Sequence, residues 1–83
     1  MRLDKFLKNS RIIKRRTVAK EAADGGRITV NGKVAKAGTN VDVGDRLVIA
    51  FGNQTMRLEV LGVPEVVRKD DAEGMYRLLG EDE

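Results

Sequence analysis

Residues 12–33 read IIKRRTVAKEAADGGRITVNGK, and this stretch decides the fold. After two β-branched residues and a basic cluster at 14–16, it has the pattern of a short amphipathic helix. Thr17 is an acceptable N-cap for that helix. The residues at the spacing of one buried stripe are Val18, Ala19, Ala22 and Ala23. Gly25-Gly26 follows, and it predicts the left-handed residue that ends the helix.

The second half of the stretch predicts a β-hairpin. Arg27-Ile28-Thr29-Val30 alternates polar and apolar residues, which is typical of a strand with one buried face. Asn31-Gly32 comes next, and both residues tolerate the positive φ that a two-residue hairpin turn requires. Residues 33–36 begin the return strand, and residues 37–40 break it into a loop.

A first helix is predicted before this stretch, over residues 2–9. Leu3, Phe6 and Leu7 recur at i, i+3 and i+4, which puts them on one apolar face. Asp4 lies in the first turn, where a carboxylate suits the positive end of the helix dipole, and its spacing to Lys8 predicts an ion pair. Residues 12–13 then form a joint between the two helices.

Further strands are predicted after residue 40. Residues 41–45 read as a turn, residues 46–51 as a strand, and residues 55–61 as its partner across a second hairpin turn at Gly52-Asn53-Gln54. The alternation of the partner strand puts three apolar residues on one face: Met56, Leu58 and Val60.

The order of the elements predicts an α+β fold, with two short N-terminal helices packed on a small antiparallel sheet. We expect residues 1–62 to form the domain and residues 63–83 an acidic C-terminal extension, which begins near the helix-breaking Pro64. Within the extension, one helical turn packed on the core is predicted before a frayed end. Its residues are Asp70 to Glu73 with Met75, Leu78 and Leu79.

Charge divides the chain into two unequal halves. Residues 1–36 carry 11 Lys or Arg and three acids, a net charge of +8. Residues 37–83 carry five Lys or Arg and ten acids, a net charge of −5. This segregation exceeds what solubility requires. A basic half of this kind indicates a polyanionic partner.

The composition argues against several classes of function. The chain has no His and no Cys, so it lacks the usual general base, the thiol nucleophile and the common transition-metal ligands. We therefore expect no enzyme activity, no metal and no cofactor. Gly25-Gly26 lacks the context of a phosphate-binding loop, and no small-molecule substrate is expected. With no apolar run of about 18 residues and no signal peptide, a cytoplasmic protein without a membrane partner is predicted.

Basic residues on the predicted helices and hairpin suit the phosphates of RNA or DNA. A guanidinium fork matches a phosphate, and the helix N-terminus near Arg16-Thr17 adds backbone donors. The candidates are Arg2, Lys5, Lys14, Arg15, Arg16, Lys20, Arg27 and Lys33. We interpret Lys8, Lys36, Arg57 and Lys69 as solvated surface charges. Because Phe6 and Phe51 are assigned to the core, no aromatic platform for single-stranded bases is expected, which favours a structured RNA.

Several motifs together resemble the S-four RNA-binding domain, a family named after a protein of the small ribosomal subunit. They cover about residues 2–51 and are Arg2-Leu3-Asp4-Lys5-Phe6-Leu7, Arg11 with Lys14-Arg15-Arg16-Thr17-Val18-Ala19, Gly26 to Lys33, and Val43-Gly44-Asp45. The resemblance implies two helices and a small sheet in an L-shaped motif whose helical face contacts RNA. It adds Arg11 and Asn31 to the candidate RNA-binding residues. The chain departs from the family pattern at Arg15, where Ser is common, and at the doubled Gly25-Gly26.

The chain length, the hairpin at Phe51-Gly52 and the acidic tail with Met75-Tyr76 further resemble one bacterial branch of that family, close to the heat-shock S-four protein. This branch serves ribosome-associated quality control. The resemblance implies a non-catalytic factor on the large ribosomal subunit, whose partners are ribosomal RNA, peptidyl-tRNA and an RqcH-type factor that adds alanine tails to stalled chains. A monomer is expected. Two alternatives stay open: a binder of another structured RNA, such as tRNA or small-subunit RNA, and a protein adaptor that uses the sheet edge and the acidic tail.

Overall fold

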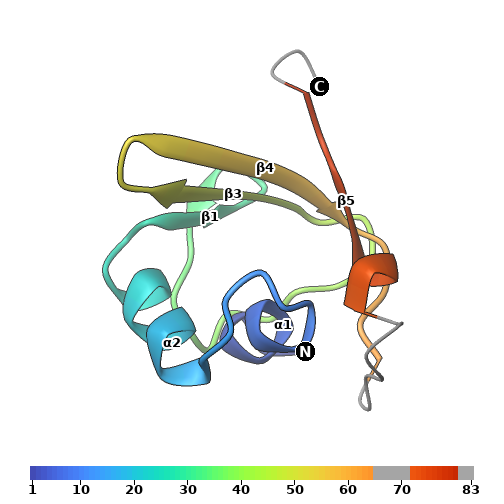
Figure 1. The fold of residues 1–83 in the computed structure, drawn as a ribbon, viewed down its shortest axis with the longest axis horizontal. Coiled ribbons are helices and arrows are strands. Elements are labelled where there is room, and N and C mark those ends of the chain that lie inside the picture. Colours follow the sequence, from blue (N-terminus) through green and yellow to red (C-terminus); the bar gives the residue numbers. More distant parts are fainter. Residues whose placement is uncertain (65–71, 81–83) are drawn as a thin grey trace.

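Two helices lie against one face of a five-stranded antiparallel sheet in the computed structural model, which describes residues 1–64 and 72–80 (Figure 1). The helices are α1 (Leu3–Asn9) and α2 (Arg16–Asp24). The predicted α+β fold, with two N-terminal helices on a small antiparallel sheet, is confirmed. In the part of the chain that the structure describes, no helix is long and apolar enough to cross a lipid bilayer.

The first helix buries the apolar face that its spacing predicts, because Leu3, Phe6 and Leu7 are all fully buried. The helix ends at its C-cap, Ser10, whose hydroxyl donates to the Leu7 carbonyl at 3.2 Å. Arg11 then adopts a left-handed backbone with φ 62°, which is uncommon for a residue other than glycine. This residue turns the chain into the joint that leads to α2.

The second helix begins two residues earlier than predicted. Its N-cap is Arg15, with no side-chain hydrogen bond to the first turn, and the predicted N-cap at Thr17 is wrong because Thr17 already lies inside the helix. Ala19 and Ala23 are fully buried as predicted, but Val18 is 45% exposed. Since successive helical residues are about 100° apart, Val18 lies beside the stripe that the two alanines form. The predicted stripe is therefore too wide.

The first hairpin follows the turn chemistry of its residues. After α2, Gly26 adopts a left-handed backbone with φ 79°. The chain then forms β1 (Ile28–Val30) and β2 (Lys33–Val34). Between these strands, φ is 53° at Asn31 and 84° at Gly32. Two consecutive residues with positive φ match the tight turn that twisted antiparallel strands prefer. Both the glycine stop and the Asn-Gly hairpin are confirmed.

The predicted second hairpin forms from β3 (Arg46–Phe51) and β4 (Gln54–Val60). The second strand begins one residue earlier than predicted, because Gln54 pairs with Phe51 and is not part of the turn. The sheet order is β2-β1-β3-β4-β5, so β3 is its central strand. Alternate residues of the two long strands face the helices and are fully buried: Leu47, Ile49, Leu58 and Val60. In Figure 1, α1 and α2 both lie on this side of the sheet, and the opposite face is turned away from them.

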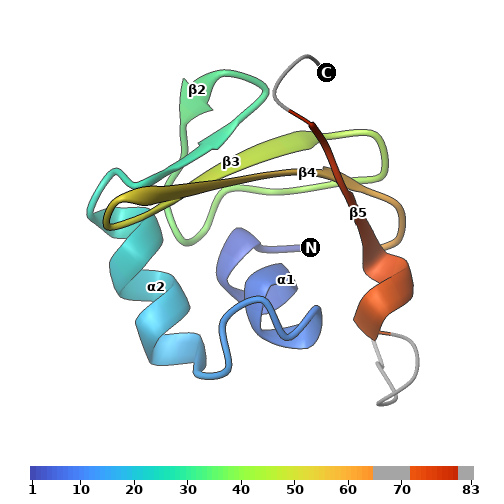
Figure 2. The same cartoon turned by 45° about the horizontal axis from the view of Figure 1, so that its top comes forward.

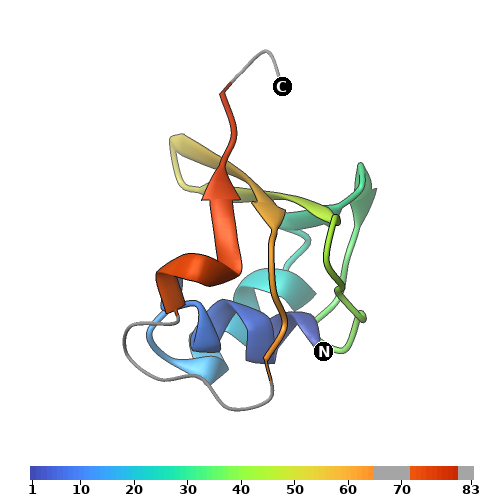
Figure 3. The same ribbon diagram turned by 90° about the vertical axis from the view of Figure 1, so that its right-hand side faces the viewer.

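The C-terminal part differs from its predicted form. A 3-10 helix, η1 (Ala72–Met75), leads into β5 (Tyr76–Leu78), which pairs with β4 at the sheet edge (Figure 3). Met75 is buried, but Leu78 is 64% exposed and belongs to a strand, so the predicted single helical turn is wrong from that residue on. Pairing with a strand about twenty residues away is a non-local interaction, which local spacing does not reveal.

Phe51, which the sequence pattern assigns to the core, is 40% exposed, and this prediction is wrong. It lies at the end of β3, beside the hairpin turn. Phe6 is fully buried as predicted. The parts of the predicted extension at residues 65–71 and 81–83 lie outside the described residues.

Candidate nucleic-acid interface

Asp4 joins basic side chains from the two helices. Its side chain is 4% exposed, and its carboxylate accepts hydrogen bonds from Arg2 Nε at 3.2 Å and Arg2 Nη2 at 3.3 Å. Arg16 Nε lies 3.5 Å from the same carboxylate. In the described structure Asp4 forms its ion pairs with these two arginines and not with Lys8, so the predicted pair of Asp4 with Lys8 is wrong. We call Arg2, Asp4 and Arg16 the arginine clamp.

The two arginines of the clamp contact Asp4 and still remain exposed to solvent. The side chains of Arg2 and Arg16 are 55% and 50% exposed, so both remain accessible to a ligand. Asp4 also accepts the backbone N–H of Lys5 at 2.8 Å, which fixes the carboxylate at the start of α1. A guanidinium carries five N–H donors, and a carboxylate can occupy only some of them. The remaining donors are available for phosphate oxygens.

The loop after β2 fixes the two helices relative to each other. At the start of α1, the Asp4 N–H donates to the Ala37 carbonyl at 3.1 Å. At the end of α2, Asp24 Oδ1 accepts the Ala37 N–H at 3.0 Å. Lys36 Nζ donates to the Asp24 carbonyl at 3.2 Å, so this lysine has a structural contact besides its exposure to solvent. One loop therefore holds the N-terminus of α1 against the C-terminus of α2, and this arrangement positions the arginine clamp.

Three cations line a shallow hollow of about 300 Å³ at the joint between the helices: Lys8, Arg11 and Lys14. None of the described residues that line it is acidic. We call this feature the cation hollow. Arg11 and Lys14 belong to the predicted site, whereas Lys8 is interpreted from the sequence as a solvated charge. The signal that points to Lys8 is its position one helical turn after Lys5, at the end of α1 that leads into the basic joint.

The other basic candidates are dispersed. Arg15 and Lys20 are exposed on α2, and Lys5 is half-buried on α1. Arg27 is exposed between α2 and β1. Lys33 lies on β2, at the edge of the sheet far from the joint between the helices (Figure 2). The structure gathers basic candidates in the arginine clamp and the cation hollow, and Lys33 contributes to neither.

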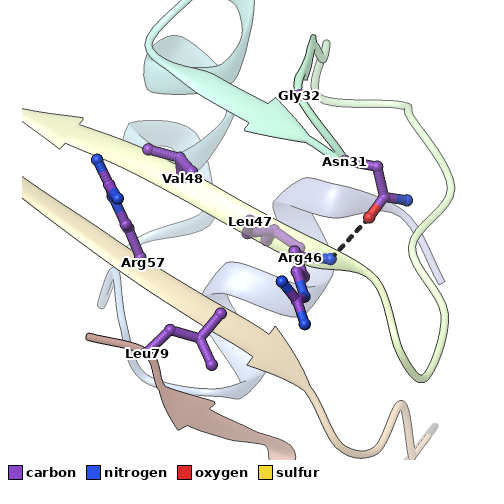
Figure 4. A pocket seen from close by; sticks show the side chains of 7 residues that line it. All are labelled: Asn31, Gly32, Arg46, Leu47, Val48, Arg57 and Leu79. Carbon is purple, nitrogen blue, oxygen red and sulfur yellow. Dashed lines mark hydrogen bonds between the residues drawn. The ribbon is translucent and has the colours of Figure 1, made fainter. Parts of the chain in front are cut away.

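Asn31 uses both polar atoms of its side chain within the protein. Its Oδ1 accepts the Arg46 N–H at 2.9 Å (Figure 4). Its Nδ2 donates to Asp45 Oδ1 at 3.1 Å. These bonds tie the turn between β1 and β2 to the start of β3. Asn31 therefore has a structural role that the sequence did not indicate.

The outer face of the sheet carries two arginines that the predicted site does not include. Figure 4 shows Arg46 and Arg57 with Val48 and Leu79 around a hollow of about 360 Å³. Arg46 and Arg57 come from the neighbouring strands β3 and β4. Because they point away from the helices, they make this face a separate surface from the arginine clamp.

The arrangement on the helices suits a ligand that carries phosphates. Arginines held by a carboxylate present their donors in fixed positions, and charge-assisted hydrogen bonds to phosphate are among the stronger ones in proteins. Within residues 1–64 and 72–80, no group of three or more His, Cys, Asp or Glu lies close enough together to hold a metal ion. The site thus offers positive charge and hydrogen-bond donors, which are the groups that suit a phosphate backbone.

The sequence matches known proteins over almost its whole length. Residues 1–47, from α1 to the start of β3, match the S4 domain. A protein of Halalkalibacterium halodurans named RQC P-site tRNA stabilizing factor is 58% identical over 82 residues, which are 99% of this chain and 93% of that protein. A protein of the same name from Streptococcus pneumoniae is 56% identical over 81 residues, which are 98% of this chain and 92% of that protein.

The fold is also similar to a solved structure. The trimeric structure of heat shock protein 15 from Vibrio cholerae has a TM-score of 0.88 at 27% sequence identity, over 98% of this chain and 83% of that chain. Family, relatives and fold agree with the resemblance to the S-four domain in the sequence. The chain therefore belongs to the S4 domain family and, within it, to the family of RQC P-site tRNA stabilizing factors.

Proposed function

We propose that this chain is a non-catalytic RNA-binding factor of the large ribosomal subunit. It binds ribosomal RNA and the peptidyl-tRNA that a stalled ribosome leaves behind, and it acts in the cytoplasm as a monomer. By holding the tRNA, it supports an RqcH-type factor that adds alanine to the stalled chain. The names of its relatives, which refer to a P-site tRNA, support the tRNA as a partner.

The observation that carries the proposal is the arginine clamp. A carboxylate that is 4% exposed fixes two half-exposed arginines from different helices. Arginines that served only solubility would not need a buried acid to orient them, because exposed ion pairs contribute little to stability. Two guanidinium groups oriented in this way suit the closely spaced phosphates of a structured RNA, which proteins read by backbone shape and charge.

The candidate residues have different roles in this proposal. The clamp and the cation hollow hold phosphates, and Arg15 and Lys20 extend the same surface along α2. Asn31 acts indirectly, because its hydrogen bonds to Asp45 and Arg46 set the position of the hairpin that presents Lys33. Lys33 contacts a more distant part of the RNA.

Co-sedimentation with purified large ribosomal subunits that carry peptidyl-tRNA tests the proposal. We expect wild-type protein to move with the subunits in a sucrose gradient and Arg15→Ala/Arg16→Ala to bind at least about tenfold more weakly, since each lost hydrogen bond to a charged group contributes about 1.5–3 kcal/mol. The far-ultraviolet circular dichroism spectrum should be unchanged in the double variant, because both side chains are exposed and Arg2 still contacts the Asp4 carboxylate.

Arg46→Ala/Arg57→Ala is the matched control, because it removes the same charge from the outer face of the sheet. A folded Arg15→Ala/Arg16→Ala protein that binds subunits as the control does would contradict the site. Sequencing of RNA crosslinked to the wild type distinguishes large-subunit RNA and tRNA from another structured RNA. Adding the protein to stalled subunits with an RqcH-type factor should lengthen the alanine tails, and unchanged tails would remove that part of the proposal.

A further inference from the structure

An apolar groove of about 400 Å³ lies between α2 and the end of β3. Its walls include Ile12 from the joint, Val18 and Ala22 from α2, and Phe51 from β3. Val18 is 45% exposed and Phe51 is 40% exposed. The volume falls within the range of about 300–1,000 Å³ that is typical of small-molecule sites. A groove walled by two exposed apolar side chains can accommodate an apolar part of a ligand.

The aromatic ring at this groove is unusual for the chain. There are only two Phe, one Tyr and no Trp, and the other phenylalanine, Phe6, is fully buried. Phe51 is thus the phenylalanine that the fold leaves accessible. Aromatic side chains that are accessible on RNA-binding proteins stack on unpaired bases, and this interaction tolerates any base because each has a π-face.

The charges around the groove suit a nucleotide. Arg27 is the charged residue among those that line the groove, although Glu21 lies beside Arg27 in a smaller hollow next to it. The joint contributes to two sites at once, because Arg11 and Lys14 line the cation hollow while Ile12 and Ile13 line the groove. Arg11 and Lys14 directly flank Ile12 and Ile13 in the chain, so one short segment contributes to both the cation hollow and the groove.

We propose that the groove receives one unpaired nucleobase of the bound RNA, which stacks on Phe51 while its phosphate lies over the cation hollow. This inference rests on the function proposed above and narrows its ligand to an RNA element with an unpaired nucleotide. An apolar segment of a protein would use the groove but would leave the neighbouring cations unmatched, whereas a nucleotide uses both.

The test compares Phe51→Ala with Phe51→Trp in binding to large ribosomal subunits that carry tRNA. Phe51→Ala should weaken binding at least about fivefold, which corresponds to the lower end of the base–aromatic stacking range. The salt dependence of binding should not change, because no charge is removed. Phe51→Trp keeps the ring and should bind within about twofold of wild type, and its single tryptophan should change fluorescence when the complex forms.

Crosslinking identifies the occupant. With a photoreactive benzoylphenylalanine in place of Phe51, we expect crosslinks to an unpaired nucleotide. Wild-type affinity of Phe51→Ala, or crosslinks only to a protein or to paired nucleotides, would overturn the inference while the proposed RNA-binding function stands. If the wild-type protein itself did not co-sediment with the subunits, the function proposed above would fail first.

Discussion

Asp4 is a buried acid in the basic half of the chain, and its carboxylate contacts Arg2, Arg16 and the Lys5 N–H. Replacing it by Asn keeps the shape and removes the charge that orients both arginines. We expect Asp4→Asn to lower the free energy of unfolding by about 1.5–3 kcal/mol, the contribution of a hydrogen bond to a charged group. We also expect weaker RNA binding, although the net positive charge rises. Urea denaturation and co-sedimentation measure the two effects.

Glu21→Gln is the matched control for this prediction, because it removes the same charge from an exposed position on α2. If the surface acted only through net charge, both variants would bind RNA more tightly than wild type. If Asp4 positions its arginines, only Glu21→Gln keeps or gains affinity. Equal gains in both folded variants would refute the positioning role.

At the scale of one helix, α2 lacks a side-chain cap because Arg15 occupies its N-cap position. Arg15 has φ −115° and ψ 130°, a conformation that a capping Ser also adopts. We expect Arg15→Ser to raise the stability by about 1 kcal/mol through a new hydrogen bond to the first turn, and to weaken RNA binding through the lost cation. The midpoint of urea denaturation and the affinity for large subunits should therefore move in opposite directions. A variant in which both fall would show that Arg15 has another structural role.

The hairpin of β1 and β2 contains one residue with a structural role, Asn31, and one that we propose binds RNA, Lys33. Asn31→Ala removes the hydrogen bonds to Asp45 and Arg46. It also places alanine, which disfavours positive φ, at a position where φ is 53°. We therefore expect the free energy of unfolding to fall by about 1–3 kcal/mol. Lys33→Ala should leave stability within about 0.5 kcal/mol and reduce RNA affinity, because Lys33 is exposed. Thermal unfolding and co-sedimentation of the two variants test this division, and a stable Asn31→Ala protein would contradict it.

These elements show which parts of the fold are predictable from sequence. The predictions for Gly26 and the Asn31-Gly32 turn are correct because their conformations depend on backbone preferences of the residues themselves. The predicted N-cap at Thr17 is wrong because the helix begins at Arg16 without a capping side chain, so capping preference alone does not determine where this helix starts. The strand β5 is not predicted because its stability depends on pairing with β4, which is far from it in the sequence. The local pattern of residues does not reveal such a pairing.

At the scale of the whole molecule, the fold gathers basic residues of the N-terminal half of the sequence into two distinct surfaces, the arginine clamp and the cation hollow. The basic residues are recognisable from the sequence as a group, but their arrangement depends on interactions between residues far apart. Asp4 and Arg16 meet because α1 packs on α2. Phe51 stays 40% exposed although Val18 and Ala22 of α2 line the same groove, because these side chains cover its ring only in part. Neither the Asp4–Arg16 contact nor the exposure of Phe51 follows from the spacing of residues in the sequence. The sequence therefore predicts the class of ligand better than it predicts how the binding residues are arranged.

The dependence of RNA binding on salt tests the surface as a unit. If the arginine clamp, the cation hollow and their neighbours neutralise about five phosphates, log K against log salt concentration should have a slope near −4. Arg15→Ala/Arg16→Ala should reduce the magnitude of that slope by about 0.7–0.9 for each phosphate that is no longer neutralised, whereas Arg46→Ala/Arg57→Ala should not change it. Fluorescence anisotropy with a labelled fragment of the crosslinked RNA, between low and physiological salt, measures these slopes. A slope near zero would mean that apolar interactions dominate, and it would favour a protein partner over RNA on this surface.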